Sequence, residues 1–232
     1  MSTAAAPEPA ATPESVISER ATPESTAAVL GMIAYGELAA FSRLAADAAL
    51  APELAQRLHL SRLAGLALRR LDRIEERVTD LGREMEPVMA PFAGVLVEFD
   101  ERTPPGTWWE RLLKGYVGYG VADDFSRIVA QALDPDTRDL VVDVLADEGY
   151  AGLVVDALAA AAAEDPTLAS RLALWGRRLV GEALGVVQRV LADHPDLRSL
   201  LDVETPGDAQ QRLFSALTAE HSRRMERLGL TP

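Results

Sequence analysis

Apolar residues recur every three to five positions over most of this chain, which is the spacing of one face of an α-helix. One such stretch covers residues 26–49 and a second covers residues 52–81. Pro52 suits the first turn of the second helix, and Gly82 is typical of the residue that follows a helix C-terminus. The pattern therefore predicts two long helices joined by a short turn.

A third long helix is predicted over residues 108–133. Gly115, Gly118 and Gly120 lie inside it, and a glycine in a helix interior costs about 1 kcal/mol relative to alanine. Glycines so close together predict either a bend in this helix or a neighbour that approaches its backbone closely.

Two prolines divide the second half of the chain, because proline cannot continue a helix. They are Pro135 and Pro166, each preceded by aspartate. We predict a fourth long helix over residues 136–163, a fifth over residues 167–193 and a last helix over residues 208–228. No segment has the alternating pattern of a strand. The fold class is therefore predicted to be all-α, with four long helices as its frame.

The N-terminal segment, residues 1–26, has a different composition. It is rich in alanine, proline, serine, threonine and glutamate, and Ala-Thr-Pro-Glu-Ser occurs in it twice. Such a segment buries too little apolar surface to offset the entropy lost on ordering. We predict a disordered tail over residues 1–26, a helical bundle over residues 27–201 and a C-terminal helix within residues 202–232 that packs on the bundle or extends from it.

The amino-acid composition excludes several kinds of functional site. Cysteine is absent from the 232 residues and histidine occurs three times, which excludes disulfides, iron–sulfur clusters and thiol catalysis. Aspartate and glutamate outnumber lysine and arginine by 36 to 23, giving a formal net charge of -13. This acidic balance argues against nucleic acid as a partner.

Two further features bear on the location of the protein. No run of about 18 uncharged apolar residues stands out, so we expect no membrane span. The first residues lack a basic segment followed by an apolar one, so we expect a cytoplasmic protein.

Several carboxylates fall on the predicted helices. Glu37 lies among the apolar residues of the first helix, where an inward charge would need a partner. Asp123 and Asp124 are adjacent in the third helix; either one of them points inward or both are solvated. Four-helix bundles of the di-iron type combine such acids with Glu-x-x-His motifs on two helices. Here the second helix has no such motif, and in the fourth the nearest match is Asp147-x-x-Tyr150.

The chain resembles actinobacterial ferritin-like proteins, which are related to tRNA 2-methylthio-N6-isopentenyladenosine hydroxylase. The resemblance spans residues 27–201, and Tyr35-Gly36-Glu37-Leu38 together with residues 174–184 carry most of it. The similar segments are residues 34–47, 89–95, 121–128, 145–155 and 172–184. The resemblance implies a ferritin-like four-helix bundle with additional C-terminal helices.

The resemblance also implies where metal ligands would lie. The family positions fall on Glu37, Ala67, Arg70, Asp124 (with Asp123 as the alternative), Asp147 and Tyr150. Ala67 cannot ligate a metal, and Arg70 would bring a fixed positive charge to the place of a metal. We therefore expect a degenerate di-iron site that holds no metal, in which Arg70 pairs with Glu37 in the centre of the bundle.

Three functions remain open from the sequence. The first is a ferritin-like protein that has lost its di-iron site and acts without catalysis or cofactor, through a surface or a protein partner; its catalytic residues, if any, are unknown. The second is a di-iron oxygenase resembling the tRNA hydroxylase. Its rearranged ligand set would be Glu37, Asp124, Asp147 and Glu148.

The third is a small-molecule binder with a pocket in the bundle core. That pocket would be lined by Phe41, Tyr116, Tyr119 and Tyr150. In each case we expect a homodimer, and the alanine-rich residues 157–163 offer a low-profile contact for it.

Overall fold

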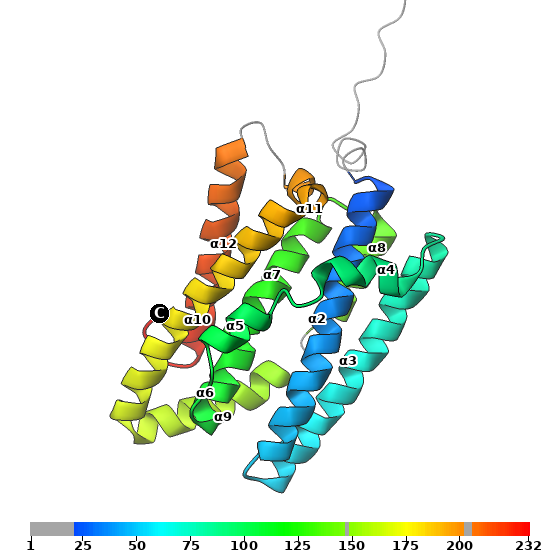
Figure 1. Ribbon diagram of the computed structural model, residues 1–232. Helices are drawn as coiled ribbons and strands as arrows, with labels where there is room; N and C mark the ends of the chain where they lie inside the picture. Colours follow the sequence, from blue (N-terminus) through cyan, green and yellow to red (C-terminus); the bar gives the residue numbers. More distant parts are fainter. Residues whose placement is uncertain (1–20, 147–148, 202–205) are drawn as a thin grey trace, which may run out of the picture.

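The structure is a computed structural model that describes residues 21–146, 149–201 and 206–232. All its regular elements within these residues are helices, which confirms the all-α fold class (Figure 1). The long elements are α2 (Pro23–Leu50), α3 (Leu54–Asp80), α10 (Pro166–Asp193) and an interrupted helix made of α6 (Trp108–Leu113), a π-helical turn (Lys114–Gly118) and α7 (Tyr119–Ala130). The shorter ones are α4 (Met85–Met89), a 3-10 turn (Ala90–Phe92), α5 (Val97–Arg102), α8 (Pro135–Val144), α9 (Tyr150–Glu164) and α11 (Pro195–Leu200), and α12 (Pro206–Arg227) ends the chain.

The first helix begins earlier than the sequence pattern indicated. Thr22 is its N-cap, and its side chain and that of Ser25 exchange hydrogen bonds with each other's backbone N–H groups. This arrangement satisfies two amide donors of the first turn. Ser25 and Thr26, which the prediction assigned to the disordered tail, are therefore helical and buried. Residues 1–20, which hold most of the predicted tail, lie outside the described part of the chain.

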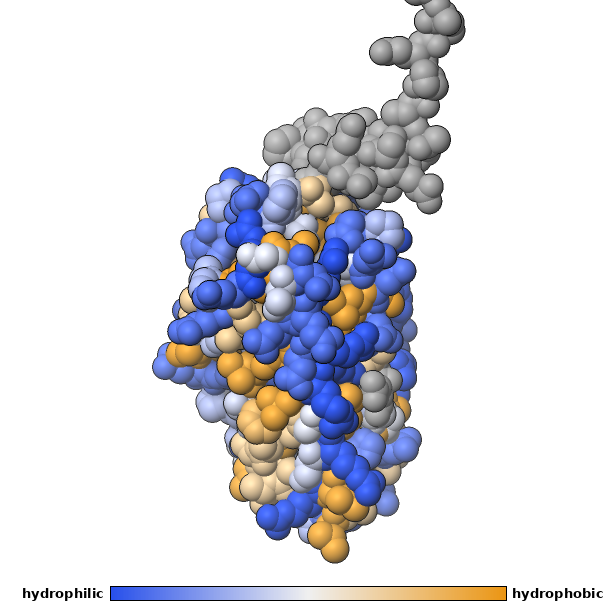
Figure 2. Space-filling model, turned by 90° about the vertical axis from the view of Figure 1, so that its right-hand side faces the viewer, coloured by the Kyte–Doolittle hydropathy of each residue, from blue (hydrophilic) through white to orange (hydrophobic). Residues whose placement is uncertain are grey.

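Helices α2 and α3 form a long hairpin that lies side by side along one flank of the bundle (Figure 1). Val29 and Ile33 of α2 and Ile74 and Val78 of α3 are buried in the main core, because their spacing places them on one face of each helix. The turn between the two helices is apolar at its surface, where Leu54 is 81% exposed. Figure 2 shows an orange tip at the lower end of the molecule, below a face on which blue areas alternate with orange and tan ones.

The expectation about membrane spans needs a correction. Within the described residues α2 is long and apolar enough, by length and composition, to cross a membrane, with a mean hydropathy of 1.3 over its best window. However, 44% of that window is buried inside the bundle. A helix in the core of a helical bundle has these same properties.

The third long helix is interrupted by the π-helical turn, and its glycines lie where neighbours come close. A Cβ atom at Gly115 would overlap the Tyr150 hydroxyl, one at Gly118 would lie 2.7 Å from the Phe99 ring, and one at Gly120 would lie 2.9 Å from the Arg224 guanidinium. These distances are too short for an alanine. They confirm the close approach that the glycines predicted.

The predicted fourth long helix is wrong. Instead of one helix over residues 136–163, the chain forms α8 and α9, and Gly149 between them has a φ of 109°. Only glycine adopts that backbone conformation readily. Residues 147 and 148 lie outside the described residues. The fourth long helix of the frame is therefore α10, which Asp165 caps by accepting hydrogen bonds from the backbone of Thr167 and Leu168.

The last helix, α12, packs against α7 and α10 (Figure 1). Its apolar face buries Leu213, Leu217 and Met225. Gly176 of α10 has no side chain at the point where Met225 packs, since a Cβ there would lie 2.5 Å from the Met225 methyl carbon. This helix therefore forms part of the packed core and borders the interior of the bundle.

Candidate ligand cavity

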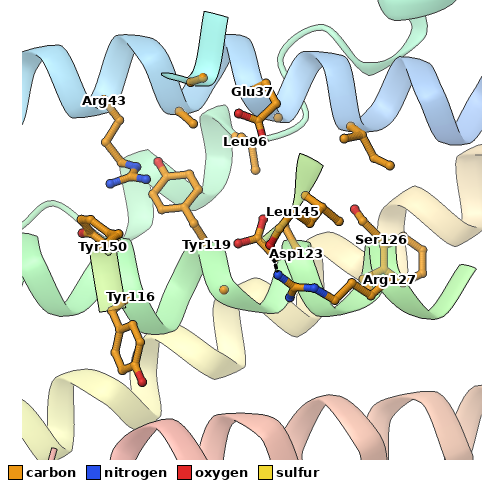
Figure 3. A pocket seen from close by; sticks show the side chains of 18 of the residues that line it. Glu37, Arg43, Leu96, Tyr116, Tyr119, Asp123, Ser126, Arg127, Leu145 and Tyr150 are labelled. Carbon is orange, nitrogen blue, oxygen red and sulfur yellow. Dashed lines mark hydrogen bonds between the residues drawn. The ribbon is translucent and has the colours of Figure 1, made fainter. Parts of the chain in front are cut away.

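A cavity of about 290 Å³ lies in the bundle, between α2, α3 and α7 and bounded by residues of α9, α10 and α12. Its polar lining comes from α2, α3, the π-helical turn, α7, α9 and α12. These residues are Tyr35, Glu37, Arg43, Arg70, Tyr116, Tyr119, Asp123, Ser126, Arg127, Tyr150, Arg224 and Arg227. Several of them are drawn in Figure 3, where Glu37 of α2 and Asp123 of α7 point toward one another across the cavity.

Glu37 is a buried carboxyl group in an apolar helix. Loss of hydration raises its pKa from 4.5 to about 8, and the nearby Asp123 raises it further, whereas Arg70 and Arg43 lower it. Its Oε2 has no hydrogen-bond partner among the described residues. The group is therefore mostly protonated at neutral pH, and it can donate a hydrogen bond into the cavity.

Of the two adjacent carboxylates of the third helix, Asp123 lines the cavity and Asp124, the preferred position from the resemblance, does not. Asp123 is an exposed residue, whereas Asp124 is buried. The protein interior around Asp123 raises its pKa, against the opposing effect of Arg127 and Arg224. Sequence reasoning had kept Asp123 only as the alternative.

Asp124 points to a different neighbour. Its two carboxylate oxygens accept hydrogen bonds from Arg224 of α12 at 2.6 and 2.8 Å, and Arg127 lies 3.3 Å away. Asp124 does not line the cavity. It serves instead as the anchor that holds α12 on the bundle.

The two positions on α3 lie where the resemblance placed them, since both Ala67 and Arg70 line the cavity. Arg70 and Glu37 both lie in the described part of the chain, and no ion pair joins them there, in contrast to the prediction. The Arg70 guanidinium donates to the carbonyl oxygen of Ala146, and Arg127 donates to that of Leu145. These carbonyls follow the C-terminus of α8, where the helix dipole attracts cations. Arg70 therefore acts on Glu37 only by its charge.

Sequence reasoning missed Arg43. Its guanidinium lies over the Tyr119 ring at 4.6 Å and beside the Tyr150 ring at 5.5 Å. Asp47, one helical turn further along α2 and 1% exposed at its side chain, is 3.5 Å away. The only signal in the sequence is the spacing of charged residues in a largely apolar helix, with Arg43 four residues before Asp47.

The aromatic lining matches the predicted pocket in three of four residues. Tyr116, Tyr119 and Tyr150 line the cavity. Phe41 does not; it packs beside the smaller apolar cluster of α2 and α3 that contains Leu60. Tyr150 donates from its hydroxyl to the Leu112 carbonyl at 3.3 Å, which attaches it to the last turn of α6.

The described residues of the cavity do not include the full donor set of a di-iron centre. Such a centre draws on four carboxylates and two histidines. Of the described residues, only Glu37 and Asp123 bring carboxyl groups to the cavity, and no cluster of three or more histidine, aspartate or glutamate side chains there could hold a metal ion. Arg43 and Arg70 add fixed positive charge beside them. Asp147 and Glu148, which the oxygenase hypothesis included, lie outside the described residues.

The long-helix frame and the cavity between its members define a ferritin-like bundle. The model of the ferritin-like domain of actinomycetes matches residues 22–204. The chain belongs to this family. No curated protein matches the sequence.

Proposed function

We propose that this ferritin-like protein binds a small organic molecule in its central cavity and does not work as a di-iron enzyme. The observation that carries the proposal is the cavity itself, because protein interiors are otherwise close-packed and an empty space forfeits contact energy. A mostly apolar cavity with a few convergent polar groups is the usual form of a small-molecule site.

The charge in the cavity supports the same proposal. Arginine stays protonated at any pH at which the protein is folded. Arg43 and Arg70 both line the space that two metal ions would occupy in a di-iron bundle, and like charges in a poorly hydrated site repel strongly. Asp124, which the oxygenase hypothesis required as a ligand, is committed to Arg224.

The first experiment is metal analysis of the purified full-length protein, after incubation with ferrous iron or manganese and desalting. We expect less than stoichiometric metal. Native mass spectrometry of the same sample is expected to show a bound organic molecule, or a shift in mass on adding one. Two tightly held metal ions per chain would overturn the proposal.

A pair of alanine variants tests whether the cavity is a real space. Ala67 and Ala64 are both buried on α3, but only Ala67 lines the cavity. We expect Ala67→Leu to abolish ligand binding with little change in stability, because the added atoms fill empty volume. Ala64→Leu enters a packed cluster, where overpacking costs about 1–3 kcal/mol. Equal loss of stability in both variants would show that no cavity exists.

A further inference from the structure

We propose that the ligand of this cavity is a small organic anion with a compact apolar body, and that Arg43 holds its acidic group. The inference rests on the proposed function and adds the chemical class of the ligand.

The first support is the state of the Arg43 guanidinium. Its side chain is 17% exposed, and its Nε and Nη1 have no hydrogen-bond partner among the described residues. A poorly hydrated charge with unsatisfied donors is costly unless an acceptor is supplied. The flanking rings of Tyr119 and Tyr150 contribute cation–π attraction, and Asp47 lies 3.5 Å from Nη1, but neither supplies a hydrogen-bond acceptor to Nε. A carboxylate, which accepts hydrogen bonds in the plane of the guanidinium, is the matching ligand group.

The second support is the way in which the surrounding carboxylates are shared. Asp47 contacts both Arg43 and Arg111, the latter at 2.9 Å. Asp47 therefore offsets one positive charge, while its two partners carry two.

Asp124 contacts both Arg127 and Arg224 in the same way. The described lining of the cavity includes five arginines, with Arg227 as the fifth, and two carboxyl groups, Glu37 and Asp123. Arginine side chains therefore outnumber the carboxyl groups among the described residues that line the cavity, although the whole chain carries a net charge of -13.

The third support is the remainder of the lining, which describes the body of the ligand. Most of the other residues are aliphatic, including Ile33, Leu44, Leu63 and Val187. A volume of about 290 Å³ is at the lower end of the range for small-molecule sites. These features favour a carboxylic acid with a short alkyl or a single-ring body over a nucleotide or a sugar phosphate.

An adjacent outer pocket offers a route of entry. It shares Tyr35, Arg43 and Tyr119 with the inner cavity, so these three side chains stand at the boundary between the two. Arg111 and Lys114 also line the outer pocket, each paired with an aspartate of the same lining, Asp47 and Asp100, so that with Arg43 its cationic groups outnumber its carboxylates by one. Positive charge at the mouth of a site attracts anions and increases their local concentration.

The test compares three head groups on one body by isothermal titration calorimetry at pH 7. The probes are octanoate, 1-octanol and octylamine, and the series is repeated with 3-phenylpropionate, 3-phenylpropanol and 3-phenylpropylamine. We expect an acid to bind about tenfold or more tightly than its alcohol, and the amine to bind weakest, because one charge-assisted hydrogen bond has that effect on affinity.

Two variants of Arg43 assign the anchor. We expect Arg43→Gln to weaken acid binding about tenfold or more while alcohol binding is unchanged, and Arg43→Lys to retain part of the preference. Arg73→Gln is the control, since Arg73 lies on the outside of α3 and pairs with Asp143. If Arg43→Gln does not fold, the wild-type series and Arg43→Lys still decide the matter.

The outcomes separate this inference from the proposed function. The anion inference would be overturned if an alcohol or amine bound as tightly as its acid. It would also be overturned if Arg43→Lys kept the full preference for acids and a folded Arg43→Gln variant bound acids normally. Either result would leave cavity binding intact. If no probe binds and a broader set of acids, alcohols and amines leaves the melting temperature unchanged, the proposed function itself fails.

Discussion

The Arg224 guanidinium of α12 and the Asp124 carboxylate of α7 form a bidentate ion pair, with N–O separations of 2.6 and 2.8 Å. The pair joins residues that are 100 positions apart in the sequence. Gly120 makes room for it, because a Cβ there would lie 2.9 Å from the guanidinium. The C-terminal helix is therefore attached beside the cavity by a specific polar contact as well as by its apolar face.

Arg224→Ala is expected to lower the free energy of unfolding by about 3 kcal/mol, because Asp124 keeps its buried position and loses its main partner. Chemical denaturation would measure the loss. Arg223→Ala is the matched control on the same helix, since Arg223 pairs with Glu220 at the surface and such pairs contribute about 0–1 kcal/mol. Equal effects of the two variants would show that the Arg224 pair is not important for stability.

Gly115→Ala is expected to displace Tyr150, because the new Cβ would overlap the tyrosine hydroxyl. We expect a loss of about 1–3 kcal/mol and weaker ligand binding. Gly181→Ala, in open space on α10, should instead stabilise the protein by up to about 1 kcal/mol. Adding Tyr150→Phe to Gly115→Ala should recover part of the loss, and no recovery would argue against this contact as the cause. Thermal unfolding of the four proteins checks the series.

The stability of the protein should fall as the pH rises from 6.5 to 8. Burial raises the pKa of Glu37 from 4.5 to about 8, so in this range the unfolded chain has released a proton that the folded chain still holds. One such proton changes the free energy of unfolding by about 1.4 kcal/mol per pH unit. Asp123, whose pKa is also raised, acts in the same direction. In Glu37→Gln the slope should be smaller; an unchanged slope would contradict the assignment.

His221 should make the protein less stable as the pH falls below 6.5. It is buried on α12, and its two ring nitrogens have no hydrogen-bond partner among the described residues. Burial, with a smaller effect of Arg224, lowers its pKa from 6.5 to about 4. The unfolded chain therefore takes up a proton first as the pH falls from 6.5 to 4, and this group removes about 1.4 kcal/mol of stability per pH unit. His221→Phe, compared with the parent protein by urea unfolding at pH 4.5 and 6.5, should reduce that loss.

The periodicity of the sequence was enough to locate the helices that pack along their whole length. Helices α2, α3 and α10 each have an apolar face, and a proline lies in the first turn of α2 and of α10. The break between α8 and α9 was missed because a glycine is tolerated inside many helices. Only the backbone conformation of Gly149 shows that the chain turns there.

The site was harder to predict for two physical reasons. Neighbouring residues on a helix point in directions about 100° apart, so the choice between Asp123 and Asp124 depends on the exact rotation of the helix. Arg43 is a charged residue, and charged residues are usually exposed. Its position became clear only when Tyr119 and Tyr150, from two other helices, were placed around it.

The π-helical turn at Lys114–Gly118 has a consequence for how this interior can change over time. A π turn adds one residue to a helix and rotates everything after it by about 100°. Asp123 and Asp124 follow that turn directly. Deletion of a single residue there would move each following side chain into the place of the one before it, so that Asp124 would take the place of Asp123 at the cavity and Phe125 would take the place of Asp124 beside Arg224. A one-codon deletion would thus change the polar groups of the cavity and remove the partner of Arg224 in the same step.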